Sequence, residues 1–130
     1  ACWDVRDRKL DYDFLRRTVR DWRQYAPNYL GDFYPLTPFT TASDAWLAWQ
    51  FDRPEAGQGV VQVFRRANSI YESARLKLRG LDVRARYVVN DLDQPHVPQE
   101  CAGSELVEKG LFVTAPAQPA AIILTYRKLK

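Results

Sequence analysis

The sequence contains no methionine among its 130 residues and no apolar run long enough to cross a membrane. The longest apolar run covers residues 120–124, whereas a spanning helix needs about 20 apolar residues. We therefore expect no contact with a membrane. Because Ala1 is not a methionine, we also expect the chain to be a piece of a longer protein. No stretch resembles a signal peptide, which slightly favours the cytoplasm.

Cysteine, histidine and glycine are equally scarce. Two cysteines, Cys2 and Cys101, are too few for a disulfide scaffold. The single histidine, His96, lies between prolines and has neither a second histidine nor a Cys-x-x-Cys pair to complete a metal site. Without a Gly-x-Ser-x-Gly elbow or a glycine-rich phosphate loop, the sequence predicts no metal, no cofactor and no serine-type nucleophile.

The formal net charge of +3 belongs to the N-terminal part of the chain. Residues 6–23 hold seven basic and four acidic side chains, and the rest of the chain is balanced. Acidic residues interleaved with basic ones favour a solvated helix face over a nucleic-acid-binding surface.

Residues 11–26 have the spacing of an amphipathic helix. Asp11 or Asp13 can cap its start, and Pro27 ends it. One face carries the apolar side chains Leu15, Val19, Trp22 and Ala26. A stripe of this kind needs a partner surface.

Residues 28–41 have no helical period and contain Pro35 and Pro38. The aromatic content of this segment is too high for a flexible linker. The aromatic residues are Tyr29, Phe33, Tyr34 and Phe39. We expect an ordered connection that packs across a domain seam, with Trp22, Tyr29, Phe33 and Tyr34 buried there and Trp22→Ala lowering the melting temperature.

After residue 42 the apolar period changes from 3.6 to 2, as strands require. Strands are predicted at 45–51, 59–66, 71–79, 86–92, 105–107, 111–115 and 120–129. Within 71–79, Ala74, Leu76 and Leu78 should face the core. Seven to eight short strands with no helix between them predict a mainly β protein, an antiparallel β-sandwich of Greek-key type preceded by one helix.

Two groups of side chains are candidates for sugar chemistry. Paired carboxylates could act as in a glycosidase, but most of the acidic residues lie in turns or at strand ends, where they serve turn geometry. These residues are Asp32, Asp52, Glu55, Glu72, Asp91 and Asp93. Trp46 and Trp49, three positions apart on one strand, should face opposite sides. They either stack on sugar or pack in the core and at the seam, and the second reading is favoured.

Three longer strings follow one another along the chain: YLGDFYPLT at 29–37, AWLAWQFDRPE at 45–55 and GVVQVFRR at 59–66. They resemble the C-terminal end of glycoside hydrolase family 36 α-galactosidases. The likeness continues through Tyr71-Glu72-Ser73, LRGLD at 78–82, Tyr87 with Asp91, and Gly103-x-Glu105-Leu106. It spans most of the chain, from about residue 11 to residue 130.

The resemblance implies a parent with an N-terminal β-supersandwich, a (β/α)8 barrel and a C-terminal sandwich. Residues 1–41 would be the last barrel helix and its connector, and residues 42–130 the sandwich. Family members are retaining enzymes whose two catalytic aspartates lie on barrel strands. The Lys-Trp-Asp type motif of the nucleophile is absent here, so no catalytic residue is assigned. The parent's sugar stays open among α-galactosides, α-N-acetylgalactosaminides and transfer to raffinose-type sugars.

The expected role is therefore non-catalytic support of the parent's barrel. A carbohydrate-binding module with its own site and a self-association or partner surface remain alternatives. The residues expected at a sugar or at the seam are Trp46, Trp49, Tyr34 and Asp32.

Overall fold

The computed structural model describes residues 4, 6–94 and 96–130. Cys2 lies outside these residues. Two helical segments come first, α1 (Tyr12–Tyr25) and the 3-10 helix η1 (Ala26–Leu30). They are followed by β1 (Asp32–Pro35), β2 (Trp46–Arg53), β3 (Gln58–Arg65), β4 (Ser73–Leu76), β5 (Arg86–Asp91), β6 (Gln99–Ala102), α2 (Gly103–Glu108), β7 (Leu111–Thr114) and β8 (Ala120–Lys128).

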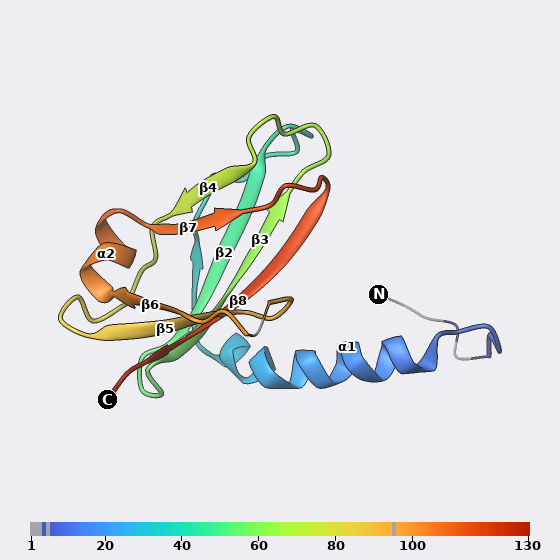
Figure 1. Ribbon diagram of the computed structural model, residues 1–130, viewed down its shortest axis with the longest axis horizontal. Helices are drawn as coiled ribbons and strands as arrows, with labels where there is room; N and C mark the ends of the chain where they lie inside the picture. The colour runs from blue at the N-terminus through green and yellow to red at the C-terminus, as the bar shows by residue number, and fades with distance from the viewer. Residues whose placement is uncertain (1–3, 5, 95) are drawn as a thin grey trace.

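The strands form two antiparallel sheets. The larger has the order β1-β2-β3-β8-β5-β6, and β4 pairs with β7 in a second sheet of two strands. Figure 1 shows β4 and β7 lying across one face of the larger sheet, while α1 extends away from the strands. The prediction of a mainly β antiparallel sandwich behind one helix is confirmed.

The core lies between the two sheets and follows the period-2 alternation of the strands. Leu76 and Leu78 are buried, as their alternation with charged residues predicted. The strand itself is shorter than predicted, because beyond Leu76 the chain leaves β7 and the Leu78 amide donates to Leu106 O, 3.0 Å away. The other core residues are Ala48, Val61, Val63, Tyr87, Val89, Leu106, Leu111, Val113, Leu124 and Tyr126.

The predicted strand at 105–107 is wrong, and so is the expectation of no helix between strands. These residues belong to α2, which buries Leu106. The apolar run was too short to reveal its period. The turn into α2 passes so close to another segment that a Cβ on Gly103 would lie 2.1 Å from Asp82 O. The neighbouring strand β6 was not predicted.

The connector also contains a strand that was not predicted. In β1, Phe33 lies opposite Phe51 and Pro35 opposite Trp49. Proline is tolerated here because β1 is an edge strand, with a neighbour on one side only. The connector is thus physically part of the larger sheet.

The N-terminal helix matches its prediction closely. Asp11 is its N-cap, and its carboxylate accepts a hydrogen bond of 2.8 Å from the Phe14 amide. The helix ends at Tyr25, and Pro27 lies in the 3-10 turn that follows. Among the residues that the structure describes, no helix has the length and apolarity of a membrane span.

Candidate interaction surface

The face of the larger sheet that is turned away from β4 and β7 is aromatic, and we call it the outer face. Partners in an antiparallel ladder share a face, which places Phe33 and Phe51 together, with ring centroids 5.2 Å apart. Trp49 and Phe64 also meet there, 5.0 Å apart. The Phe33 side chain is 55% exposed. A row of partly exposed aromatic rings of this kind is typical of a surface that contacts another protein or domain.

The 3-10 helix η1 covers one end of the outer face. The Tyr29 ring stands edge-on to Phe51 at 4.9 Å. Gln62 donates through Nε2 to the Tyr29 hydroxyl (3.0 Å) and accepts through Oε1 from Trp49 Nε1 (2.6 Å). These contacts fix the point at which α1 leaves the sheet.

An open apolar groove of about 560 Å³ continues the outer face beyond Trp49. Leu47, Trp49 and Phe64 form part of its wall, together with residues 65–67 and 119–121. The guanidinium groups of both lining arginines are held by this chain: Arg66 Nη1 donates to Ala42 O at 2.7 Å, and Arg65 donates to Ser69 O and Ala115 O. The groove therefore offers a partner mainly apolar contact.

Helix α1 presents a second apolar surface. Leu15 and Val19 line a groove of about 550 Å³ that is flanked by Arg16, Arg20 and Arg23. Trp22 is 48% exposed, and α1 runs away from the sheets. Within this chain Trp22 and Phe33 are thus exposed, and Tyr29 and Tyr34 are partly buried. Burial of these residues at a seam with the parent's barrel stays a prediction.

Residues 46–124 match the sequence model of the glycosyl hydrolase family 36 C-terminal domain. This match covers more than half of the chain. The chain belongs to this family. No curated protein matches the sequence.

Solved structures of family 36 enzymes share the fold. One similar structure is the galactosidase domain of the α-galactosidase-sucrose kinase AgaSK, with a TM-score of 0.68 and 22% identity over 88% of this chain. Two others are the family 36 α-galactosidases of Geobacillus stearothermophilus, AgaB (TM-score 0.60, 21% identity, 87% of this chain) and AgaA A355E (TM-score 0.65, 21% identity, 87% of this chain). The chain spans 14–15% of the length of these three structures.

The four site residues predicted from the sequence do not converge in this family 36 domain. Trp46 faces the core, and its indole N–H donates to Tyr71 O at 3.0 Å, whereas Trp49 lies on the outer face. The two tryptophans thus face opposite sides, as predicted, and form no paired sugar platform. Tyr34 and Asp32 share the core-side face of β1, where Asp32 is exposed. Only Trp49 belongs to the aromatic surface.

Asp52 is a buried carboxylate that sequence reasoning did not recognise as buried. Asp52 is 3% exposed and accepts a hydrogen bond of 2.5 Å from the Tyr126 hydroxyl. Gln50 donates to the same hydroxyl and to Arg79 O, both at 2.8 Å. Burial raises the pKa of Asp52, although the bond from Tyr126 opposes this, and the charges of Asp32 and Glu55 raise it further. The period-2 alternation, with Ala48, Gln50 and Asp52 on one face, was the available signal.

The remaining chemistry-bearing residues stand apart. His96 is exposed and Cys101 is a free thiol packed beside the core, with its pKa raised by burial. Within residues 4, 6–94 and 96–130, no three His, Cys, Asp or Glu side chains are grouped to hold a metal.

Proposed function

We propose that this chain is the non-catalytic C-terminal domain of a retaining α-galactosidase and that it supports the parent's catalytic barrel. Residues 1–41 are proposed as the last barrel helix and its connector, and residues 42–130 as the sandwich. Family membership and the small share of the family 36 enzymes that the chain spans support this role. The catalytic aspartates are then expected in the parent's barrel rather than here.

The exposed apolar surface of α1 is the observation on which the proposal depends. Val19 and Trp22 on the apolar stripe of α1 are exposed, and the helix extends away from the strands, so it has a hydrophobic face to bury. Full burial of each large apolar side chain contributes roughly 1.5–3 kcal/mol. The flanking arginines favour a partner surface with acidic groups beside its apolar centre.

The outer face provides the second part of the proposed contact. Phe33, Trp49 and Phe64 continue from the end of α1 along β1, β2 and β3. The ring contacts of Tyr29 hold the helix exit against this face, so that one partner could cover both surfaces. In this role the sandwich acts mechanically, by burying apolar surface of the barrel.

The first test is the coding sequence upstream of Ala1 and the activity of the chain. The proposal expects an upstream (β/α)8 barrel with two catalytic aspartates, and no hydrolysis of an aryl α-galactoside by the 130-residue chain. Turnover by the purified chain, or a reading frame without a barrel, would contradict it.

The second test compares two single variants of the longer protein, each of which places a carboxylate on a different side of α1. Val19→Asp lies in the apolar groove and should lower the melting temperature and the α-galactosidase activity together. Arg17→Asp, on the opposite side of the helix, is the control and should change both much less. Equal effects of the two substitutions would show that the stripe is not buried.

Self-association through the outer face is the principal rival. Sedimentation of the chain distinguishes self-association from the support role. A concentration-dependent dimer that Trp49→Ala abolishes would favour self-association. A monomer at all concentrations is expected from the proposed role. A sugar platform made by Trp46 and Trp49 together is not favoured, because Trp46 is packed against the core.

A further inference from the structure

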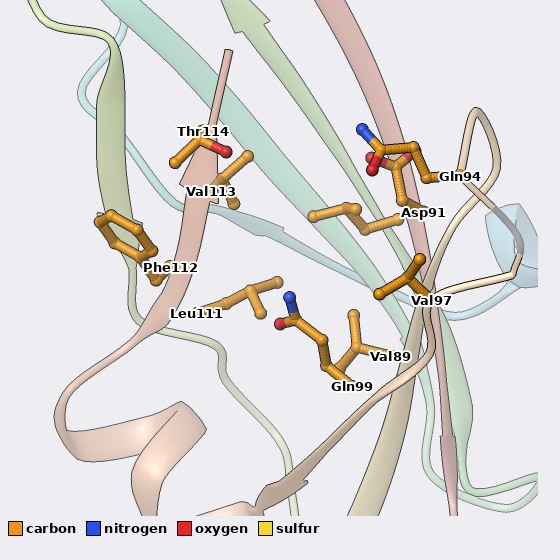
Figure 2. Close-up of a pocket in the computed structure, with 10 residues that line it drawn as sticks. Val89, Asp91, Gln94, Val97, Gln99, Leu111, Phe112, Val113 and Thr114 are labelled. Atoms are coloured by element: carbon orange, nitrogen blue, oxygen red, sulfur yellow. The ribbon is translucent and has the colours of Figure 1, made fainter. Parts of the chain in front are cut away.

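A small polar cleft opens between the two sheets, on the opposite side of the larger sheet from the outer face. It has a volume of about 120 Å³ and lies between β7 and the end of the larger sheet formed by β5 and β6 (Figure 2). Its floor is apolar and is built by the buried side chains of Val89, Leu111, Val113 and Leu124. None of these residues belongs to the proposed barrel contact.

One wall of the cleft is the edge of β7 that pairs with no other strand among the described residues. The Ala115 amide donates to Glu72 O at 2.8 Å, which sets the alternation of the ladder between β4 and β7. Leu111 and Val113 consequently direct their backbone groups to β4, and Phe112 and Thr114 direct theirs to the other side. This explains why both residues line the cleft although their side chains are exposed. The wall offers backbone N–H donors and C=O acceptors.

The wall that faces β7 carries two polar side chains, Gln99 and Asp91. Gln99 on β6 extends its amide into the space between Leu111 and Val89, and Asp91 at the end of β5 approaches from the other side (Figure 2). Asp91 Oδ1 accepts from the Asp93 amide at 2.9 Å, and among the described residues this is the one hydrogen bond of its side chain, so the second oxygen can accept from a ligand. In the part of the chain that the structure describes, the side-chain amide of Gln99 has no hydrogen-bonding partner.

These groups select for hydroxyls. Amides and backbone groups provide donors and acceptors, and a hydroxyl is the group that both donates and accepts. Asp91 is the only charged residue of the lining and has a negative charge, which disfavours phosphate and other anions. A floor of aliphatic side chains suits C–H groups. The volume of about 120 Å³ is well below that of an ordinary drug-sized pocket, so the ligand or the part of it that enters must be small.

We propose that this cleft binds a neutral polyol, by holding the vicinal hydroxyls of a small polyol or of a terminal sugar residue. Gln99 and Asp91 bind the hydroxyls together with the edge of β7, and the carbon atoms lie on the apolar floor. The site recognises its ligand without bond cleavage. It is independent of the support role, and its test requires no barrel.

The experiment is a titration of the 130-residue chain followed by NMR. Glycerol and galactose are the probes, and tert-butanol is the control, since it has glycerol's approximate size but a single hydroxyl. The signals to follow are the Gln99 side-chain amide and the backbone amides of Phe112 and Thr114. Saturable shifts with either polyol, with a Kd in the millimolar range, and no saturation with tert-butanol support the proposal.

Matched variants separate the cleft from the rest of the surface. Gln99→Leu should weaken binding by about five-fold or more, since one hydrogen-bonding group is lost. Glu100→Gln, the next residue on β6 but on its opposite face, should leave binding unchanged. Asp91→Asn keeps the shape of the turn and should also weaken binding, and melting curves verify that each variant folds. Shifts that do not saturate, equal response to tert-butanol, or unchanged binding by both Gln99→Leu and Asp91→Asn would overturn the proposal.

Discussion

The Tyr126 hydroxyl donates a hydrogen bond of 2.5 Å to the Asp52 carboxylate, and both residues are buried. Tyr126 comes from β8 and Asp52 from β2, the two neighbours of the central strand β3. The bond therefore ties residues 74 positions apart across the middle of the larger sheet. Burial raises the pKa of Tyr126, and the bond to Asp52 raises it further, so Tyr126 acts as a donor at all ordinary pH values.

Tyr126→Phe should destabilise the fold by about 1–3 kcal/mol, because it leaves a buried carboxylate without its hydrogen bond. Urea denaturation followed by fluorescence measures the change. Asp32→Asn, at an exposed position opposite Asp52 in the ladder, should stay within about 0.5 kcal/mol of the parent chain. A Tyr126→Phe chain as stable as the original would show that the bond contributes nothing net.

The ionisation of Asp52 should make stability depend on pH. Its folded pKa is raised by burial above the ordinary value of 3.8, so the folded state binds the proton more tightly than the unfolded state. The resulting stability is present below pH 3.8 and is lost as the pH rises through the folded pKa.

Asp52→Asn removes this titration. As the pH rises from 3.8 through the folded pKa of Asp52, the stability of the variant relative to the original chain should therefore increase. Urea denaturation of both chains at several pH values measures the difference. A difference that stays constant with pH would contradict the raised pKa.

Tyr29 and Trp22 should differ sharply when each is replaced by alanine. Tyr29→Ala removes ring contacts with Tyr25 and Phe51 and the bond from Gln62, and should cost about 1–3 kcal/mol. Trp22→Ala should change the stability of this chain by no more than about 0.5 kcal/mol, since Trp22 is half exposed. Thermal melts of the two variants make the comparison, and a larger loss for Trp22→Ala would show that α1 packs on the sandwich.

Arg65 should be intolerant of replacement although it has no carboxylate partner among the described residues. It is 4% exposed, and its guanidinium donates to Ala115 O, Pro116 O, Ser69 O and Gln118 Oε1. Arg65→Met leaves these oxygens without a donor and should cost about 2–4 kcal/mol, because several buried acceptors lose their bonds together.

Arg127→Met, at an exposed position on β8, is the matched control for Arg65→Met and should be nearly neutral. Chemical denaturation of both variants provides the measurement. Equal stability of the two would show that loops 66–70 and 115–119 do not depend on the guanidinium.

Elements whose own residues carry a clear apolar pattern were predicted well. Helix α1 was predicted from its stripe and its Asp11 cap, and β2, β3, β5, β7 and β8 were predicted from alternation or apolar runs. In each case the side chains of one segment carry the pattern, because one face meets the core and the other does not. That Trp46 and Trp49 face opposite sides followed from the same rule, whereas the structure shows that Trp46 is the one that faces the core.

Elements whose own residues carry no clear pattern were predicted poorly. The residues 105–107 are too few to distinguish periods of 2 and 3.6, and α2 forms because Leu106 is buried beside the end of β4. In β1, the prolines suggested an irregular connection, and its pairing with β2 is a contact between distant segments. The cleft beside β7 likewise depends on which strand edge stays unpaired, which no local pattern records.

The amino-acid sequence by itself determined the sandwich class, the amphipathic helix and the likeness to family 36, because local periodicity and characteristic strings are written in consecutive residues. The tertiary structure alone decided that Asp52 is buried against Tyr126, that Trp22 lies away from the sandwich, and that Gln99 faces the edge of β7. These features depend on strand order and on the packing of segments far apart in the chain. Burial of a side chain and pairing of a strand edge are therefore set by the complete tertiary structure and not by any single segment.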